Sequence, residues 1–195
     1  MRLDLLDDSR LEAERQFVPI KKSGTGSFGS VFVADWQSPL PPCTLLPAMQ
    51  HSYTRPEYMG KRIVAIKKMK RSYKTLQDCL SLNELHAFVM IPPHENIILL
   101  YDVFRKPLTH ELFLVFECME GNLYQLIKSR KGRAMASGLI ASITKQAVSG
   151  MAHIHAHGFL HRDMKPENLL ITTTGLGDYP NPGANSGTLK QDVLV

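Results

Sequence analysis

The feature that most constrains the fold is a polar segment enclosed by two regular elements. The segment reads His-Arg-Asp-Met-Lys-Pro-Glu-Asn over residues 161–168. Before it, apolar residues recur every three or four positions from Met135 to Ile154, which predicts a long amphipathic helix. After it, residues 169–172 favour a short strand. We therefore expect the segment to be a loop that is held at both ends.

The first half of the chain is predicted to consist mainly of strands. β-Branched and aromatic residues dominate five segments, which are residues 17–20, 30–36, 62–67, 97–104 and 111–116. Residues 75–91 have helical spacing and are stopped by Pro92 and Pro93, and residues 123–128 predict a short helix. Because strands come first and helices follow, the predicted fold class is α+β.

Two segments are predicted to be loops. Residues 37–60 contain five prolines (Pro39, Pro41, Pro42, Pro47 and Pro56), which exclude a continuous helix or a central strand and predict an exposed insertion. Residues 173–187 are rich in Gly, Pro, Asn and Thr, and a strand-like run begins again at Leu189 and reaches Val195.

Composition excludes several classes of protein. The chain has 195 residues, of which 44% are hydrophobic and 21% charged, which is ordinary for one globular domain. The net charge of +5 is spread along the chain without a zinc-finger or RNA-binding signature, so we expect a basic face that handles phosphates and no nucleic-acid partner. Cys43, Cys79 and Cys118 lack the spacing of a disulfide framework or zinc site. No signal-peptide core or membrane-length apolar run is present, so we expect a cytoplasmic or nuclear protein without a membrane partner.

A glycine-rich segment lies between the first two predicted strands. Residues 24–31 (Gly-Thr-Gly-Ser-Phe-Gly-Ser-Val) fit the pattern G-x-G-x-x-G-x-V, in which glycines let the backbone approach phosphate groups closely. A dinucleotide site would need a helix after the glycines, whereas the residues after Val31 are strand-like. A plain hairpin turn remains the alternative interpretation.

Lys67 and Glu84 are predicted to form a buried ion pair. Lys67 ends an otherwise apolar strand (Val64-Ala65-Ile66-Lys67), and Glu84 shares a helix face with the apolar Leu80 and Phe88. A buried lysine and an inward carboxylate are each costly unless they pair with an opposite charge. An edge-strand lysine and a solvent-facing glutamate are the alternatives.

The polar segment carries groups suited to phosphoryl transfer. Asp163 can accept a hydroxyl proton, Lys165 can neutralise charge on a transferred phosphoryl group, and Asn168 offers a carbonyl oxygen for a metal ion. The alternative is a charged surface turn. Alternating His153, His155 and His157 superficially resemble a metal-binding tract, but structural or capping roles are the preferred interpretation.

Four features taken together resemble the eukaryotic protein kinase signature. They are Gly24/Gly26/Gly29, Val64-Ala-Ile-Lys67, Glu84 and His161-Arg-Asp…Asn168. Lys165, two residues after Asp163, resembles serine/threonine rather than tyrosine kinases. Residues 119–126 and 154–170 are similar to the male-germ-cell-associated kinases and their fungal meiosis-inducing relatives in the cyclin-dependent-kinase-like group.

The resemblance implies a two-lobed fold with a complete β-rich N-lobe and only the first part of the helical C-lobe. Its expected divisions are an N-terminal extension (1–16), the N-lobe (17–116, with the insertion 37–60), a hinge (117–122) and a partial C-lobe (123–195). It also implies ATP and Mg²⁺ as cofactors and protein substrates with Ser or Thr. An upstream activating kinase is implied as well, because Arg162 beside Asp163 needs an anion, which a phosphorylated residue would supply.

The resemblance further assigns roles in nucleotide binding. Phe116 would be the gatekeeper, and the backbone of Glu117 to Met119 would bind adenine. The adenine ring would lie between Val31, Ala65 and Leu170, and the phosphates beneath the glycine-rich segment (Gly24, Thr25, Gly26, Ser27, Phe28 and Gly29). Lys67, Glu84, Asp163 and Lys165 would be catalytic, with Asn168 as the metal ligand.

The sequence contains neither the Asp-Phe-Gly nor the Ala-Pro-Glu motif of the family, and it ends where Asp-Phe-Gly is expected. We therefore expect the 195-residue chain to be an incomplete catalytic domain with little or no activity, and the helix at 135–154 to expose an apolar face. The alternative function is a non-catalytic nucleotide-binding or interaction module.

Overall fold

A computed structural model describes residues 11–12, 14–26, 28–39, 56–172 and 189–191. The chain divides into two compact units. The first unit comprises Met1–Pro92 and Leu99–Cys118, and the second comprises Pro93–Ile98 and Met119–Val195. A search of the described part of the chain for a helix that could cross a membrane finds none.

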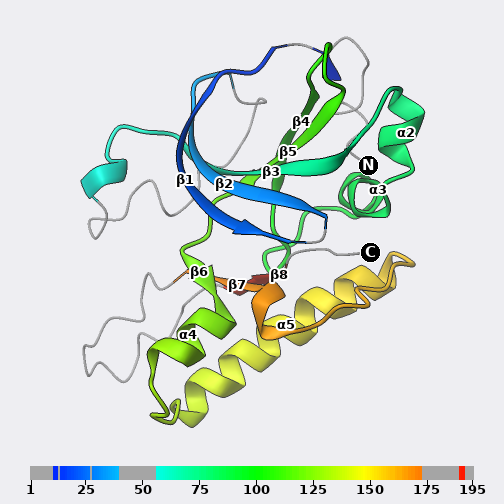
Figure 1. Cartoon of the computed structure of the whole chain (residues 1–195). Coiled ribbons are helices and arrows are strands. Elements are labelled where there is room, and N and C mark those ends of the chain that lie inside the picture. Colours follow the sequence, from blue (N-terminus) through cyan, green and yellow to red (C-terminus); the bar gives the residue numbers. More distant parts are fainter. Residues whose placement is uncertain (1–10, 13, 27, 40–55, 173–188, 192–195) are drawn as a thin grey trace. The chain divides into compact units, whose positions relative to one another are not determined.

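A five-stranded antiparallel sheet forms the body of the first unit (Figure 1). Its strands are β1 (Phe17–Thr25), β2 (Gly29–Trp36), β3 (Ile63–Ser72), β4 (Leu100–Arg105) and β5 (Glu111–Glu117), in the spatial order β1-β2-β3-β5-β4. All five predicted strands are present, with different ends. β3 continues beyond Lys67, and β4 begins later than predicted, since the Ile97 N–H donates to the His94 carbonyl in a turn.

The core of the first unit is aromatic. Its buried residues lie on β2, β3, β4 and β5, and they are Ala34, Trp36, Val64, Ile66, Tyr101, Phe104, Phe113 and Val115. The rings of Phe104 and Phe113 stack with centroids 4.8 Å apart, and Phe17 at the start of β1 lies 6.1 Å from Phe104. Because β1 and β4 are the two edge strands, this contact shows that the sheet curls round and brings its edges together.

The predicted helix over residues 75–91 is wrong as one element, because the structure has two helices. α2 (Leu76–Leu80) begins with a capping box in which Thr75 and Asp78 exchange hydrogen bonds. Leu82 is in an extended conformation and caps α3 (Asn83–Met90). The hydroxyl of Ser81 donates to the Asp78 carbonyl at 2.6 Å, and the Leu82 N–H donates to the Cys79 carbonyl, so the chain tightens there and restarts.

The predicted exposed insertion is packed at its C-terminal end. Pro56–Tyr58 form a 3-10 helix (η3), and Tyr58 is buried with Val33, Ile63 and Cys118. Residues 40–55 of the insertion lie outside the described residues, as do the predicted loop at 173–187 and the last four residues of the run that begins at Leu189.

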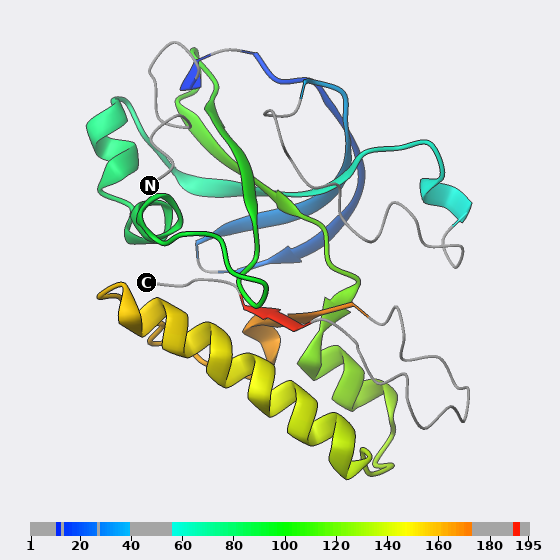
Figure 2. The ribbon, with the colours of Figure 1, turned by 180° about the vertical axis from the view of Figure 1, so that it is seen from behind.

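The second unit combines helices with a small sheet (Figure 2). Its elements are α4 (Leu123–Ser129), α5 (Ser137–Ala156), η4 (Pro166–Asn168), β6 (Gly121–Asn122), β7 (Leu169–Ile171) and β8 (Leu189–Gln191). Leu123, Leu169 and Ile171 form its buried cluster, against which Ile143 and Ala147 of α5 pack. Both predicted helices are present, and the order of strands followed by helices confirms the α+β class.

Candidate functional site

The glycine-rich segment runs from the end of β1 to the start of β2, and its two ends differ sterically. A Cβ atom on Gly29 would lie 2.4 Å from the carbonyl oxygen of Lys68 in β3, so only glycine fits there. A Cβ on Gly24 or Gly26 would meet no atom within 4 Å. The Gly26 N–H donates to the Gly29 carbonyl at 2.9 Å, and Phe28 is exposed. Ser27 lies outside the described residues.

Lys67 and Glu84 meet inside the first unit. The ammonium of Lys67 donates to both carboxylate oxygens of Glu84, at 2.6 and 2.7 Å. Only 8% of Lys67 and 4% of Glu84 is exposed. Lys67 lies in register with Val31 of β2 and Leu114 of β5, so its stem is surrounded by apolar strand residues. Two opposite charges in such surroundings stabilise each other, and neither could remain ionised at low cost alone.

Phe116 connects β5 with α3. The residue is buried, pairs with Ala65 of β3 in the sheet, and places its ring 5.1 Å from that of Phe88. Phe88 and Glu84 lie one helical turn apart on α3, so the ring contact and the ion pair fix the same helix face against the sheet. Ala65 and Val31 are half-buried.

Glu117, the last residue of β5, has a role that the sequence did not reveal. Its side chain is buried, and its carboxylate accepts the N–H of Leu99 at 2.7 Å, while its own N–H donates to the Leu99 carbonyl at 3.0 Å. Only the backbone of Glu117 entered the sequence prediction. One pattern in the sequence could have indicated this role. Glu117 directly follows the apolar run Leu112–Phe116, and a carboxylate that is buried with such a run needs a hydrogen-bond donor.

In the second unit, Asp163, Lys165 and Asn168 form one hydrogen-bonded cluster. The Lys165 ammonium lies 2.6 Å from a carboxylate oxygen of Asp163. The amide nitrogen of Asn168 donates to the same oxygen at 3.0 Å and to the Asp163 carbonyl at 2.8 Å. The helix η4 brings Asn168 back to Asp163. The loop predicted between α5 and β7 is present.

The surroundings of Asp163 keep its carboxyl group ionised. Hydrogen bonds from Lys165 and then from Asn168 lower the pKa of Asp163 below its ordinary value. The buried His161 shapes the loop, because its carbonyl accepts the Asp163 N–H at 2.9 Å. Arg162 between them has a φ of 59°, a conformation that non-glycine residues rarely adopt. The resulting carboxylate is partly exposed and can accept a proton from an incoming group.

Two further residues of the predicted site lie in the second unit. Met119 is half-buried and directly precedes Glu120, whose N–H donates to the Ile171 carbonyl of β7. Leu170 is the central residue of β7 and is paired with Asn122 of β6. Because side chains alternate along a strand, Leu170 points away from the cluster that buries Leu169 and Ile171.

The histidines on α5 have structural contacts. The ring of His153 lies 4.6 Å from that of His94, which comes from the segment Pro93–Ile98, and 4.4 Å from that of His157. His94 accepts the Asn96 N–H through Nδ1 at 3.0 Å, and Asn96 donates to Gln146 of α5. A search of the described residues finds no cluster of three or more His, Cys, Asp or Glu residues suited to a metal ion.

Comparison with known proteins matches this chain to a protein-family model and to several protein kinases. Residues 53–178 match the model of the protein kinase domain, a range that begins after the glycine-rich turn. The chain is 38% identical to the meiosis induction protein kinase IME2/SME1 of Saccharomyces cerevisiae, over 78% of this chain and 25% of that protein. It is 36% identical to the sporulation protein kinase mde3 of Schizosaccharomyces pombe (86% and 27%), and 44% identical to the human serine/threonine-protein kinase MAK (57% and 18%).

The chain thus spans about a quarter, or less, of the length of these curated relatives. Their names agree with the resemblance to meiosis-inducing and germ-cell kinases, which is thereby confirmed. Since the matched range covers most of the chain and includes Lys67, Glu84 and the Asp163 loop, this chain belongs to the protein kinase family.

Proposed function

We propose that this chain forms part of an ATP-dependent protein serine/threonine kinase, which transfers the γ-phosphoryl group of MgATP to a serine or threonine hydroxyl. The observation that carries the proposal is the Asp163 cluster, in which Lys165 and Asn168 hold an ionised carboxylate. A module that only binds a nucleotide needs no such proton acceptor.

In this proposal the first unit supplies most of the nucleotide contacts. Lys67, fixed by Glu84, would bind phosphate oxygens. The open space beside Gly24 and Gly26 would let the phosphates approach the backbone closely. Val31 and Ala65 would contact the adenine ring next to the gatekeeper Phe116, and the backbone of residues 117–119 would bind the edge of the ring.

The proposed chemistry relies on positioning and charge neutralisation. Asp163 would orient the substrate hydroxyl and accept its proton, and it is ionised at neutral pH as that role requires. Lys165 would neutralise charge on the transferred phosphoryl group, since its ammonium already lies against Asp163. Arg162 beside them would bind a phosphorylated residue supplied by an upstream kinase.

Asn168 fits a role as a magnesium ligand. Its amide nitrogen is used by Asp163, which leaves the amide oxygen as the atom for a metal ion. Mg²⁺ prefers oxygen ligands and usually keeps several waters and phosphate oxygens, so one protein oxygen is compatible with its binding. The bound ion would neutralise charge on the phosphates.

The test compares the unmodified protein with its Asp163→Asn variant, both carrying a completed catalytic domain, because we expect the 195-residue chain alone to have little or no activity. Transfer from radiolabelled ATP to casein is measured together with the affinity for MgATP. We expect the variant to lose about 10²–10⁴-fold in turnover with its nucleotide affinity nearly unchanged, because only the proton acceptor is removed. Equal turnover would contradict the assigned role. Nucleotide binding without transfer in both proteins would favour the non-catalytic module.

A further inference from the structure

We propose that residues 11–12 and 14–16 act as an N-terminal clamp that holds α2 and α3, and with them Glu84, through Arg105 at the end of β4. All of these residues belong to the first unit. That the position of Glu84 matters for phosphoryl transfer rests on the proposed function. The coupling itself is a property of the folded unit and is testable without catalysis.

Arg105 is the centre of the proposed coupling. It is 4% exposed, and its guanidinium donates to two main-chain carbonyls, those of Tyr73 and Lys74, and pairs with the carboxylate of Glu12. The buried Nε atom has no hydrogen-bond partner among the described residues. A buried cation that is already incompletely bonded depends on the carboxylate that pairs with it, here that of Glu12, since an uncompensated buried charge is costly.

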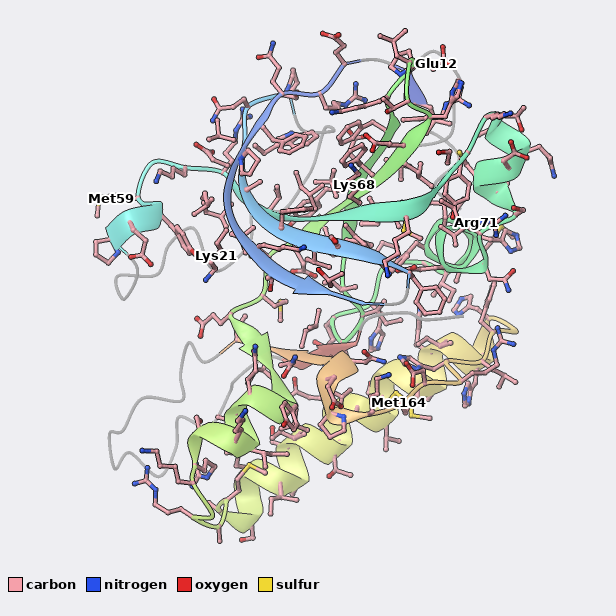
Figure 3. All side chains as sticks on the ribbon, viewed as in Figure 1. Glu12, Lys21, Met59, Lys68, Arg71 and Met164 are labelled. Carbon is pink, nitrogen blue, oxygen red and sulfur yellow. The ribbon has the colours of Figure 1, made fainter. Side chains whose placement is uncertain are left out.

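The clamp is attached to the sheet at three places. Glu12 pairs with Arg105, and Arg15 pairs with Asp102 on the same strand at 2.6 Å. The Gln16 carbonyl accepts the N–H of Gln37 just beyond β2. Leu11 is completely buried, which anchors the start of the clamp. Figure 3 shows Glu12 beside the end of β4. The clamp therefore bridges edge strand β4 to the beginning of β1.

The contacts of Arg105 lead directly to α2. Tyr73 and Lys74 come immediately before Thr75, the residue that caps this helix. The Lys74 N–H donates to the side chain of Asp78, which closes the same capping box. Hydrogen bonds from Thr75, and after them the one from Lys74, lower the pKa of Asp78, and the charge of Arg105 makes the smallest contribution. Arg105 thus fixes the backbone from which α2 starts.

From α2 the path to Glu84 is short. Leu82 follows α2 and caps α3, in which Glu84 lies in the first turn. Since α2 has only five residues, it is not stable as a helix without tertiary contacts. A loosened start of α2 is therefore expected to loosen the first turn of α3.

The experiment is amide hydrogen exchange, measured by NMR, on the whole chain and its Glu12→Gln variant. This substitution removes the charge from a half-exposed side chain and keeps its shape, so we expect the variant to fold. Glu14→Gln is the matched control, because Glu14 is exposed and lies on the same segment. The reporter amides are those of Cys79, Ser81, Leu82 and His86, which are all hydrogen-bonded within or next to α2 and α3.

We expect exchange at the reporter amides to be about tenfold faster in Glu12→Gln, with β5 amides and the Glu14→Gln variant unchanged. Faster exchange confined to residues 11–16 would overturn the proposal, because the clamp would then hold only itself. An equal rise in β3 and β5 would also overturn it, since the clamp would then stabilise the whole unit without selectivity. Neither outcome depends on phosphotransfer.

Discussion

At the scale of single residues, burial distinguishes two neighbouring lysines of β3. Lys67 and Lys68 each form an ion pair with a shortest distance of 2.6 Å, to Glu84 and Glu111. The side chains of the first pair are 11% and 5% exposed, and those of the second pair 39% and 28%. Solvent weakens the second pair, whereas the first pair has little access to water.

We predict that Lys67→Met and Glu84→Leu each lower the free energy of unfolding by about 3 kcal/mol, because each leaves an uncompensated buried charge. The double variant is expected to be more stable than either single variant. Urea denaturation of all four proteins measures the coupling free energy.

The control is the same cycle with Lys68→Met and Glu111→Leu, for which we expect a coupling below about 1 kcal/mol. Equal coupling in the two cycles would contradict the inference that burial makes the Lys67 pair different.

At the scale of elements, the turn between β1 and β2 has one constrained glycine and two unconstrained ones. We predict that Gly29→Ala lowers the free energy of unfolding by about 2 kcal/mol, because the new methyl group would lie 2.4 Å from the Lys68 carbonyl oxygen. Gly26→Ala is the control, with an expected change below about 1 kcal/mol, since nothing lies within 4 Å. Urea denaturation measures both, and similar losses would refute the distinction.

The sequence predicted most elements correctly, because strands and helices leave periodic apolar patterns. It missed the break at Ser81 and Leu82, since both flanking helices keep the same apolar spacing and the break depends on local hydrogen bonds. The Lys67–Glu84 contact was predicted because a buried charge requires an opposite one. The pairing of Arg105 with Glu12 was not predicted, since nothing in the order of residues indicates which distant carboxylate pairs with a given arginine.

At the scale of the whole molecule, the second unit includes a segment from an earlier part of the chain. Pro93–Ile98 is anchored to α5 by the ring contact of His94 with His153 and by the Asn96–Gln146 hydrogen bond. Burial, and then the neighbouring His153, lower the pKa of His94, while Glu95 acts in the opposite direction. Protonation at Nδ1 would also break the bond from the Asn96 N–H.

This anchor predicts acid sensitivity. A histidine with a lowered pKa in the folded state stabilises the fold fully above its unfolded pKa of about 6.5, and the contribution is lost as the pH falls below that value. We expect His94→Phe to reduce the dependence of unfolding free energy on pH between 7 and 5, by at most about 1.4 kcal/mol per pH unit. His155→Phe, at an exposed position on α5, is the control. An unchanged pH dependence in His94→Phe would exclude His94 as the cause.

The steric difference between the two ends of the glycine-rich turn also has a consequence for motion. The Phe28 carbonyl accepts the Lys70 N–H at 3.0 Å, and Gly29 lies against the Lys68 carbonyl, so this end is attached to β3. The other end, at Gly24 and Gly26, has open space beside it. The β1 end is held by β2, through the pairing of Gly24 with Val31 and through the Gly26 N–H that donates to the Gly29 carbonyl. Because β3 holds the Gly29 end in addition, we expect the Gly24 end to move more than the Gly29 end when the turn opens.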